Sequence, residues 1–280
     1  MNRIVSKREL APKIKLLEIE AAEVAEKAKA GQFVILRIDE GGERFPLTIV
    51  DWDKKNGTIT LIFLEVGVST EKLGALKGGD VILDVLGPLG NPSDIKKYGS
   101  VCVIGGGVGT ASAFPIARAF KEAGNKVVSI VGAKTAGLLI LENEMKKVSD
   151  ELFVSTDDGS KAQKGFVSDA LKTLIEKGYT FDAVYAIGPT VMMRAVAETT
   201  RPYGIKTIVS LNPIMVDGIG MCGACRVSVG DQTRFACVDG PEFDAHLVNF
   251  GELLKRQMAY MSEEKAALQR LQERRCAHYE

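Results

Sequence analysis

The sequence predicts an antiparallel β-barrel followed by a parallel α/β sheet, with a cysteine-rich loop and a helix at the end. Three observations support this prediction. Short apolar runs separated by turn residues fill residues 1–98, strand-like and helix-like segments alternate over residues 99–211, and three of the five cysteines fall within residues 222–237. At 280 residues the chain is long enough for about two domains with cores of their own. We therefore expect three parts, residues 1–98, 99–211 and 212–280.

The composition excludes some classes of protein. Lys and Arg number 36 and are balanced by 36 Asp and Glu, so net charge gives no reason to expect nucleic acid or an anionic membrane as partner. The first eight residues contain no apolar run of the kind found in a secretory signal, and no stretch approaches the roughly 18 apolar residues that span a bilayer. We expect a cytoplasmic protein, whose cysteines are ligands or buried thiols rather than disulfides.

The first part of the chain has the pattern of short β-strands. Runs rich in Val, Ile and Phe predict strands at residues 14–19, 33–38, 45–52, 58–66 and 81–86. Turn signals such as Gly41-Gly42 and Asn56-Gly57 separate them, and residues 21–30 favour a short helix. Strands at this spacing are typical of a small antiparallel barrel.

The second part alternates strands with helices. We expect strands at residues 101–104, 127–131, 152–155, 183–187 and 207–210, and helices near residues 110–123, 138–148, 167–176 and 191–199. This alternation predicts a parallel sheet covered by helices on both faces, with ligands at the C-terminal ends of its strands. A charged helix is expected at residues 250–275, packed on this protein or on a partner.

The cysteine-rich loop contains the strongest motif. Asp217, Cys222, Cys225 and Cys237 are separated by four, two and eleven residues. Spacings of four and then two are those of plant-type [2Fe–2S] ferredoxins, although a carboxylate stands here where the first cysteine is expected. Intervening glycines suit a loop that turns its N–H groups toward inorganic sulfide. The motif predicts a [2Fe–2S] cluster on these four residues.

Other interpretations of the cysteines stay open at this point. Three thiolates and a carboxylate could hold zinc, and the thiols could also be unliganded. If a fourth cysteine replaces Asp217, the candidates are Cys102, in a predicted buried strand, and Cys276, near the end of the chain. Residues 212–241 have too few apolar positions for a core of their own, and a metal centre would supply the missing stability.

Three loops at predicted strand ends form a candidate nucleotide site. A glycine-rich loop at residues 105–110 follows a strand and opens a helix, whose N-terminus offers free N–H groups to a pyrophosphate. The other two loops, taken singly, are better explained by helix caps and turns. Their shared position at the sheet edge favours nucleotide binding. The expected contacts are Gly106, Gly107, Val108, Gly109, Thr110, Asp157, Asp158, Gly159, Gly188, Pro189 and Met192.

Two segments of the barrel are candidates for a second nucleotide, although ordinary turns explain them equally well. An Arg can clamp a pyrophosphate, a Thr hydroxyl can bond a flavin ring, and a helix start can seat a phosphate. The candidates in these two segments are Arg44, Pro46, Leu47, Thr48, Gly67, Val68, Ser69 and Thr70. Gly87, in a separate segment, is expected to form a turn first and a ligand contact second. We assign no catalytic residue, because hydride transfer between nicotinamide and flavin needs no proton relay. The two histidines, His246 and His278, are expected to be structural or on the surface.

Taken together, these motifs resemble the ferredoxin–NADP reductase superfamily over nearly the whole chain. Residues 44–48 look like its flavin motif, with one extra residue before Thr48 and no preceding tyrosine. Residues 105–110 look like its pyrophosphate loop, and Gly188-Pro189 with Met192 like its nicotinamide-side motif. The resemblance implies FAD on the barrel and a nicotinamide nucleotide on the sheet. The expectation of NAD rather than NADP rests on the resemblance alone, since the residues favour neither and Lys134 would suit the 2′-phosphate of NADP.

The cysteine loop resembles the electron-transfer subunits related to class B dihydroorotate dehydrogenase, which use four cysteines. Asp217, with residues 211–218, is more similar to the small subunit of NADH-dependent reduced ferredoxin:NADP oxidoreductase, also called sulfide dehydrogenase. That resemblance implies FAD, a [2Fe–2S] cluster, NAD(H) and a heterodimer with a larger subunit that carries FAD and [4Fe–4S] clusters. It implies electron transfer within a bifurcating enzyme. The alternatives are a dihydroorotate dehydrogenase B subunit and, from another class, a zinc-stabilised nucleotide-binding module without redox turnover.

Overall fold

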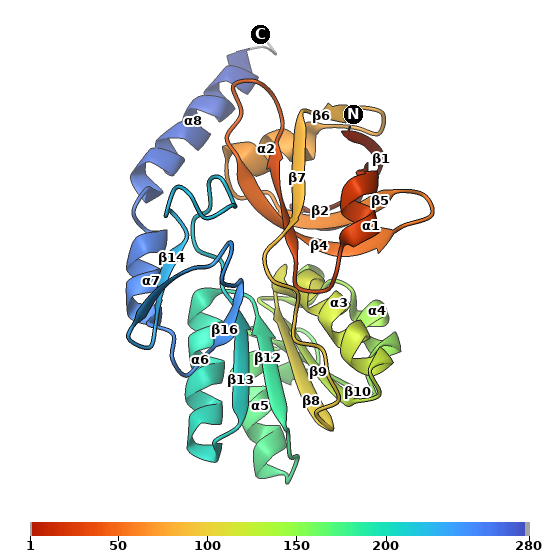
Figure 1. Ribbon diagram of the computed structural model, residues 1–280, viewed down its shortest axis with the longest axis vertical. Coiled ribbons are helices and arrows are strands. Elements are labelled where there is room, and N and C mark those ends of the chain that lie inside the picture. Colours follow the sequence, from red (N-terminus) through yellow and green to blue (C-terminus); the bar gives the residue numbers. More distant parts are fainter. Residues whose placement is uncertain (1, 278–280) are drawn as a thin grey trace.

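The computed structural model describes the backbone of residues 2–277 and the side chains of residues 2–273. An antiparallel barrel lies above a parallel sheet, and the C-terminal helices run along one side of both (Figure 1). This is the barrel-plus-sheet architecture expected from the sequence. No helix of the described part is long and apolar enough to cross a membrane.

The barrel has seven strands in the order β6-β1-β2-β5-β4-β3-β7, and all their pairings are antiparallel. Only Leu83 separates the two strands at the ends of this order, so the sheet almost closes on itself. Its strands are β1 (Asn2–Ala11), β2 (Ile14–Glu20), β3 (Phe33–Arg37), β4 (Phe45–Asp53), β5 (Thr58–Leu64), β6 (Val81–Ile82) and β7 (Asp84–Leu89). Two short helices, α1 (Ala22–Lys27) and α2 (Val68–Ala75), complete it.

Two details of the barrel differ from the prediction. Strand β1 was not expected, because four of its ten residues are charged, and Ile4 and Ala11 are its buried residues. The single strand expected at residues 81–86 is divided into β6 and β7, which pair with opposite ends of the barrel.

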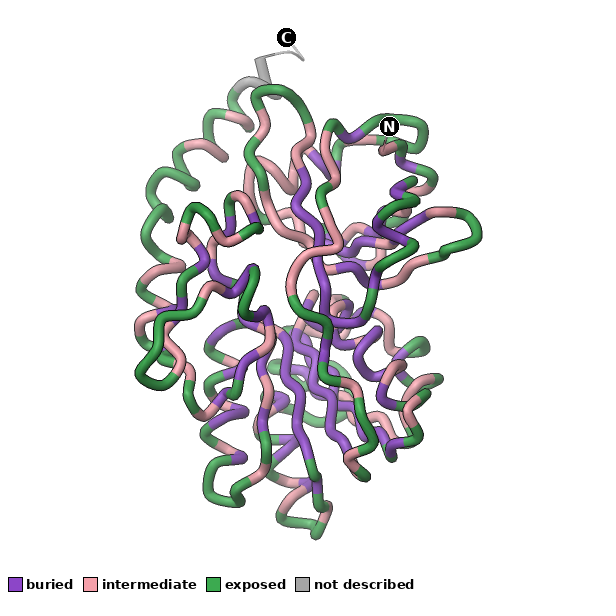
Figure 2. Tube along the Cα trace, in the orientation of Figure 1, coloured by how far each residue is buried: buried purple, intermediate pink, exposed green. Residues whose placement is uncertain are grey.

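The parallel sheet has the order β11-β10-β9-β8-β12-β13-β16. Alternate residues of its central strands face opposite sides: Val101 and Val103 pack with α3 and α4, whereas Cys102 and Ile104 pack with α5 and α6. These central strands are the most continuously buried part of the chain (Figure 2). The strands are β8 (Ser100–Gly106), β9 (Lys126–Ala133), β10 (Glu151–Thr156), β11 (Gln163–Lys164), β12 (Ala183–Ile187), β13 (Lys206–Ser210) and β16 (Glu242–Asp244). The helices are α3 (Gly109–Glu122), α4 (Glu142–Lys147), α5 (Val167–Glu176) and α6 (Thr190–Thr200), with short 3-10 turns at Ala136–Leu138 and Arg201–Tyr203.

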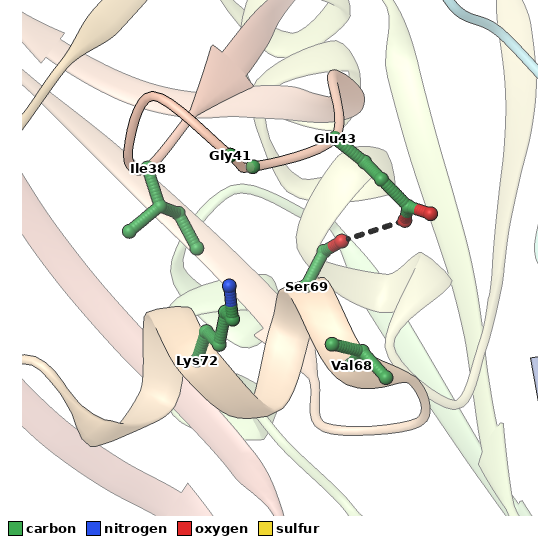
Figure 3. A pocket seen from close by; sticks show the side chains of 7 residues that line it. Ile38, Gly41, Glu43, Val68, Ser69 and Lys72 are labelled. Carbon is green, nitrogen blue, oxygen red and sulfur yellow. Dashed lines mark hydrogen bonds between the residues drawn. The ribbon is translucent and has the colours of Figure 1, made fainter. Parts of the chain in front are cut away.

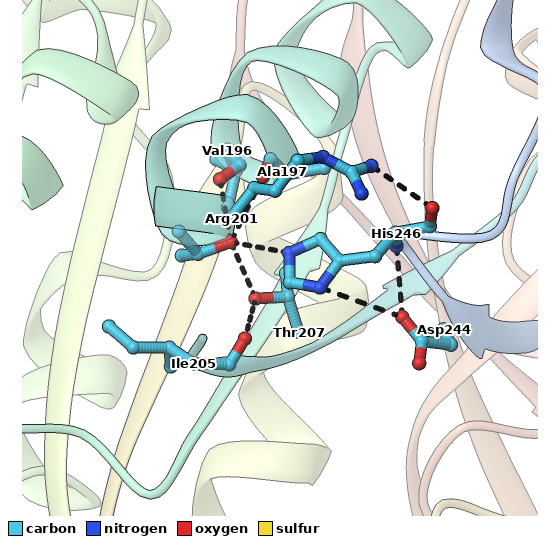
Figure 4. Close-up of polar contacts among 8 residues, drawn as sticks. Val196, Ala197, Arg201, Ile205, Thr207, Asp244 and His246 are labelled. Carbon is cyan, nitrogen blue, oxygen red and sulfur yellow. Dashed lines mark hydrogen bonds and ion pairs between the residues drawn. The ribbon is translucent and has the colours of Figure 1, made fainter. Parts of the chain in front are cut away.

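Strand β16 returns from the cysteine-rich segment and adds an antiparallel edge to this sheet. A polar cluster beside it fixes the return (Figure 4). His246 Nε2 lies 3.0 Å from Thr200 Oγ1, Thr207 Oγ1 donates to the same Thr200 oxygen at 2.7 Å, and Arg201 donates to the His246 carbonyl at 3.0 Å. These hydrogen bonds give His246 a structural role between α6 and the segment after β16. His278 lies outside the described residues.

The C-terminal segment contains a hairpin, β14 (Arg226–Val229) and β15 (Gln232–Phe235), and two helices, α7 (Phe250–Gln257) and α8 (Met261–Ala277). The sequence predicted one helix here. The Asn249 side chain caps α7 by accepting a hydrogen bond from the Glu252 N–H, and α7 packs against α6 and β14. Helix α8 leaves in a new direction and reaches α2 of the barrel (Figure 1).

Candidate functional site

The glycine-rich loop between β8 and α3 packs against the loop that follows β12. A Cβ atom on Gly109 would lie 2.4 Å from the Ile187 carbonyl oxygen, and one on Gly106 would lie 2.3 Å from Met192 Sδ. Gly107 has a φ of +56°, and a Cβ there would meet no atom within 4 Å. The structure thus brings together two of the three predicted nucleotide loops. The close approach requires glycine at position 109, where the nearest atoms belong to the backbone, whereas at position 106 the nearest atom is the end of the flexible Met192 side chain.

The third predicted loop lies at the same edge of the sheet, farther along it. Asp157, Asp158 and Gly159 follow β10, which β9 separates from β8. Asp158 Oδ1 accepts hydrogen bonds from the Ser160 hydroxyl at 2.6 Å and from the Ser160 N–H at 2.9 Å. These bonds lower the pKa of Asp158, so the residue is ionised and engaged in its own turn. Contacts of this loop with a nucleotide stay a prediction.

The predicted flavin residues of the barrel flank strand β3. Pro46 pairs with Ile35 and Thr48 pairs with Phe33 across β4 and β3, while the exposed Arg44 comes just before β4. Gly87 lies on β7, on the other side of β3, and a Cβ there would lie 2.8 Å from Val34 Cγ1.

The second predicted flavin segment forms the start of α2. Thr70 Oγ1 accepts from the Gly67 N–H at 3.1 Å, and Ser69 Oγ donates to Glu43 at 3.0 Å. A pocket of about 120 Å³ lies between this helix and the loop before Arg44, as Figure 3 shows. Its lining residues are Ile38, Gly41, Gly42, Glu43, Val68, Ser69 and Lys72. Lys72 was not among the predicted residues, although it lies three positions after Ser69 and so on the same face of the helix.

The β14–β15 hairpin explains the long spacing between Cys225 and Cys237. Arg226 pairs with Phe235, and the Ala236 N–H donates to the Cys225 carbonyl at 3.1 Å, so that Cys225 and Cys237 meet at the open end of the hairpin. Their sulfurs are 3.2 Å apart and both residues are 2% exposed, whereas Cys222 is exposed. Burial raises the pKa of Cys237 to about 12, so this thiol would release a proton on binding a metal.

Asp217 lies on the same loop and faces the Cys222 segment. Its two carboxylate oxygens accept from the Ile219 N–H at 3.0 Å and from the Cys222 N–H at 2.7 Å. Burial alone would raise its pKa, but the hydrogen bonds outweigh burial and the pKa of Asp217 is lowered. The residue is therefore ionised, as a ligand must be. Gly218, Gly220 and Gly223 all have positive φ angles, as expected of a loop around sulfide.

The donor set is chemically suited to an iron–sulfur cluster, because two adjacent buried sulfurs share a glycine-rich loop with a third sulfur and a carboxylate. Within residues 2–273, no three His, Cys, Asp or Glu side chains converge on one point to hold a single metal ion. Cys102 is enclosed in β8, where burial raises its pKa, and the Cys276 side chain lies outside the described part.

The cysteine-rich loop, called the cluster loop below (residues 217–225), packs on the barrel. A Cβ on Gly218 would lie 2.6 Å from Ile35 Cγ1 and 2.9 Å from Leu89 Cδ1. Just beyond β7, Asn91 donates from its backbone to the Gly240 carbonyl at 2.7 Å and from its side chain to the Val238 carbonyl at 3.1 Å. The residues around Cys237 are thereby fixed to the strand that carries Gly87.

Comparison with known protein families gives two matches. A model of the oxidoreductase NAD-binding domain matches residues 103–198, and one of the iron–sulfur cluster binding domain of dihydroorotate dehydrogenase B matches residues 212–249. The second match favours an iron–sulfur cluster over the zinc alternative.

Relatives extend these matches over nearly the whole chain. The dihydroorotate dehydrogenase B (NAD(+)) electron transfer subunit homolog of Thermotoga maritima is 48% identical over 96% of this chain and 95% of its own. The corresponding electron transfer subunit of Fusobacterium nucleatum is 35% identical over 81% and 89%. A chain from the structure of the NADH-dependent reduced ferredoxin-NADP oxidoreductase is 47% identical, with a TM-score of 0.92 over 97% of this chain and 98% of its own.

These matches confirm the expected reductase-like fold and an oxidoreductase with NAD- and iron–sulfur-binding domains. The chain belongs to the family of dihydroorotate dehydrogenase B electron transfer subunits and their homologues.

Proposed function

We propose that this protein is the electron-transfer subunit of a cytoplasmic, bifurcating NADH-dependent ferredoxin:NADP oxidoreductase. It exchanges a hydride between NAD(H) and FAD, and single electrons through a [2Fe–2S] cluster with a larger subunit that carries FAD and [4Fe–4S] clusters. The proposal is supported above all by the position of Ile35, which pairs with Pro46 of the flavin motif and touches Gly218, next to Asp217. Ile35 thus connects the strand of the flavin motif with the loop of the proposed cluster ligands.

The proposed nucleotide residues differ in what they do. Gly109 allows the glycine loop to approach the backbone of Ile187 and Gly188 closely, and Gly106 lies against the Met192 side chain. Backbone N–H groups at the start of α3 would hold an anionic pyrophosphate. Gly107 leaves open space above the loop. In the barrel, Arg44 and the start of α2 would hold the FAD phosphates, and Thr48 the ring. FAD, when bound, accepts two electrons as a hydride and releases them one at a time.

The proposed ligands of the cluster are Asp217, Cys222, Cys225 and Cys237. In this proposal residues 1–98 bind FAD, residues 99–211 bind NAD(H), and residues 212–280 hold the cluster and face the partner. The matched structure of 47% identity supports ferredoxin:NADP chemistry, and the Asp217 carboxylate in place of a cysteine supports the same choice.

A second candidate function is the electron-transfer subunit of a dihydroorotate dehydrogenase. It is favoured by the family model over residues 212–249 and by the relative of 35% identity. The two candidates differ in the partner subunit and in the substrate that this partner oxidises or reduces.

Anaerobic purification of the chain with its copurifying partner tests the proposal. We expect flavin, iron and inorganic sulfide on this chain, bleaching of the flavin absorption by NADH, and an EPR signal of a reduced [2Fe–2S] cluster. Reduction of NADP by NADH and reduced ferredoxin together supports the first candidate. Oxidation of dihydroorotate with NAD supports the second, and a colourless protein that contains zinc would refute both.

A further inference from the structure

Two arginines bind consecutive carbonyl groups of the cluster loop. Arg226 donates to the Gly223 carbonyl at 3.3 Å, and Arg256, on α7, donates to the Ala224 carbonyl at 3.0 Å. Both carbonyls lie between Cys222 and Cys225. Each guanidinium therefore contacts the segment that joins two proposed ligands.

The surroundings of the two arginines differ. Arg226 is exposed, whereas Arg256 is half-buried and its Nε is enclosed without a hydrogen-bond partner in the described part of the chain. None of the ion pairs among the described residues includes Arg256. The nearest carboxylate along α7, Glu252, accepts a hydrogen bond from Ser228 at 2.5 Å instead.

Enclosing the Nε of a guanidinium without a hydrogen-bond partner is unfavourable, and a nearby anion compensates for this cost. A [2Fe–2S] cluster is such an anion, because four anionic ligands and two sulfides outweigh the charge of two ferric ions. Reduction adds one electron and makes the cluster more negative. A nearby positive charge therefore stabilises the reduced form more than the oxidised form.

The residue after Arg256 keeps α7 in place. Gln257 Nε2 donates to the Asn212 carbonyl at 2.9 Å, and Thr190 Oγ1 donates to Gln257 Oε1 at 2.8 Å. Thr190 begins α6, directly after the proposed nicotinamide residues Gly188 and Pro189. The end of α7 is thus anchored to the nucleotide loop, and this anchor holds the guanidinium against the cluster loop.

We propose that Arg256 is a positioning residue that fixes the segment between Cys222 and Cys225 and raises the reduction potential of the cluster with its positive charge. This inference rests on the proposed function, since it requires the cluster. Arg226 contacts the same segment but is exposed, so that solvent and salt screen its charge. Its effect on the reduction potential of the cluster is therefore much smaller.

The test compares Arg256→Gln, Arg256→Lys and Arg226→Gln in the full chain with its partner, by redox titration of the cluster EPR signal. We expect a negative shift of the midpoint potential in Arg256→Gln. In Arg256→Lys, which keeps the charge, and in Arg226→Gln the potential should stay near the wild-type value. Flavin content should be equal in all four proteins.

An unchanged potential in Arg256→Gln, or an equal shift in Arg226→Gln, would overturn the inference. If Arg256→Gln does not retain the cluster, Arg256→Lys decides: a wild-type potential supports the role of the charge, and loss of the cluster or a negative shift refutes it. A wild-type protein without a cluster would refute the proposed function itself. That outcome differs from a cluster whose midpoint potential does not change when Arg256 is replaced, which would refute only the inference about Arg256.

Discussion

Arg118 Nη2 lies 2.9 Å from Asp51 Oδ1, and this ion pair joins the helix after the glycine loop to the strand of the flavin motif. The guanidinium carbon also lies 5.4 Å from the ring centroid of Trp52 and 5.3 Å from that of Phe114. The Arg118 side chain is 26% exposed, so the contact is partly shielded from water. It fixes how the barrel sits on the sheet, and with it how the two proposed nucleotide sites face each other.

Arg118→Ala should lower the free energy of unfolding by about 1–2 kcal/mol, because it removes an ion pair and two cation–π contacts. Lys121→Ala is the matched control on the same helix. Lys121 pairs with Asp150 within the sheet domain, and we expect a loss of at most about 0.5 kcal/mol. Urea unfolding of both variants measures the difference. Equal losses would show that the contact between barrel and sheet adds nothing.

Cys225→Ala should remove the cluster and leave FAD bound, because the proposed flavin residues lie on the barrel and not on the cysteine loop. Iron, sulfide and flavin analysis of the purified variant measures this. Cys102→Ala is the control: Cys102 is buried in β8, its pKa is raised by burial, and its replacement should leave the cluster in place. Loss of flavin together with the cluster in Cys225→Ala would contradict the proposed division of the chain.

Asp217→Cys should retain the cluster and lower its reduction potential, because thiolate stabilises ferric iron better than carboxylate does. Asp217→Asn is the informative companion, since its amide oxygen can still accept one of the two backbone hydrogen bonds but carries no charge. We expect a weakened or absent cluster in this variant. Redox titration with EPR detection measures both, and an unchanged potential in Asp217→Cys would show that Asp217 is not a ligand.

The sequence predicted most of the parallel sheet, because its strands are continuous apolar runs and its helices have clear ends. Helix α5 and strand β12 lie where they were expected, at Val167–Glu176 and Ala183–Ile187. Strand β1 was missed since one face of it is solvated and charged. Strand β16 was missed for another reason: three residues after a cysteine-rich loop have no periodicity, and only pairing with β13 makes them a strand.

The candidate site was predictable where chemistry depends on spacing along the chain. The cysteine motif and the glycine loop are local patterns that the sequence shows directly, and their roles in binding cofactors stay predictions. The contact of Arg256 with the Ala224 carbonyl was not predictable, because 31 positions separate Arg256 from Cys225 and only the packing of α7 on β14 brings them together. Contacts between segments this distant depend on tertiary structure, which one sequence does not reveal.

Gly109→Ala should destabilise the protein and abolish NAD(H) binding. The new methyl group would meet the Ile187 carbonyl oxygen at 2.4 Å and Gly188 Cα at 2.7 Å, and both are backbone atoms that cannot move aside without displacing β12. We expect a loss of about 3 kcal/mol or more. Gly137→Ala is the control, because the nearest atom to its Cβ position is 4.0 Å away. Urea unfolding and NADH titration measure the two effects, and a stable Gly109→Ala variant that binds NADH would contradict the close approach of these loops.

Glu242 on β16 should make the stability of the protein depend on pH. Burial raises its pKa from the ordinary 4.5 to about 7; the hydrogen bond from Ser93, at 2.5 Å, opposes this shift and the charge of Asp94 adds to it. The folded chain therefore binds this proton more tightly than the unfolded chain. The stabilisation is fully present below about pH 4.5 and is lost as the pH rises through about 7, by up to about 3 kcal/mol.

Glu242→Gln removes this titration and keeps an oxygen that accepts from Ser93. We expect its stability to equal or fall below that of the wild type at pH 5 and to exceed it at pH 8. Glu18→Gln is the control for replacing a carboxylate that accepts from a hydroxyl, here Thr58 at 3.1 Å. Urea unfolding between pH 5 and 8 gives the slope for each protein. If the wild type and Glu242→Gln have parallel profiles, the carboxyl group of Glu242 is solvated, and β16 is not packed against Ser93 as the structure has it.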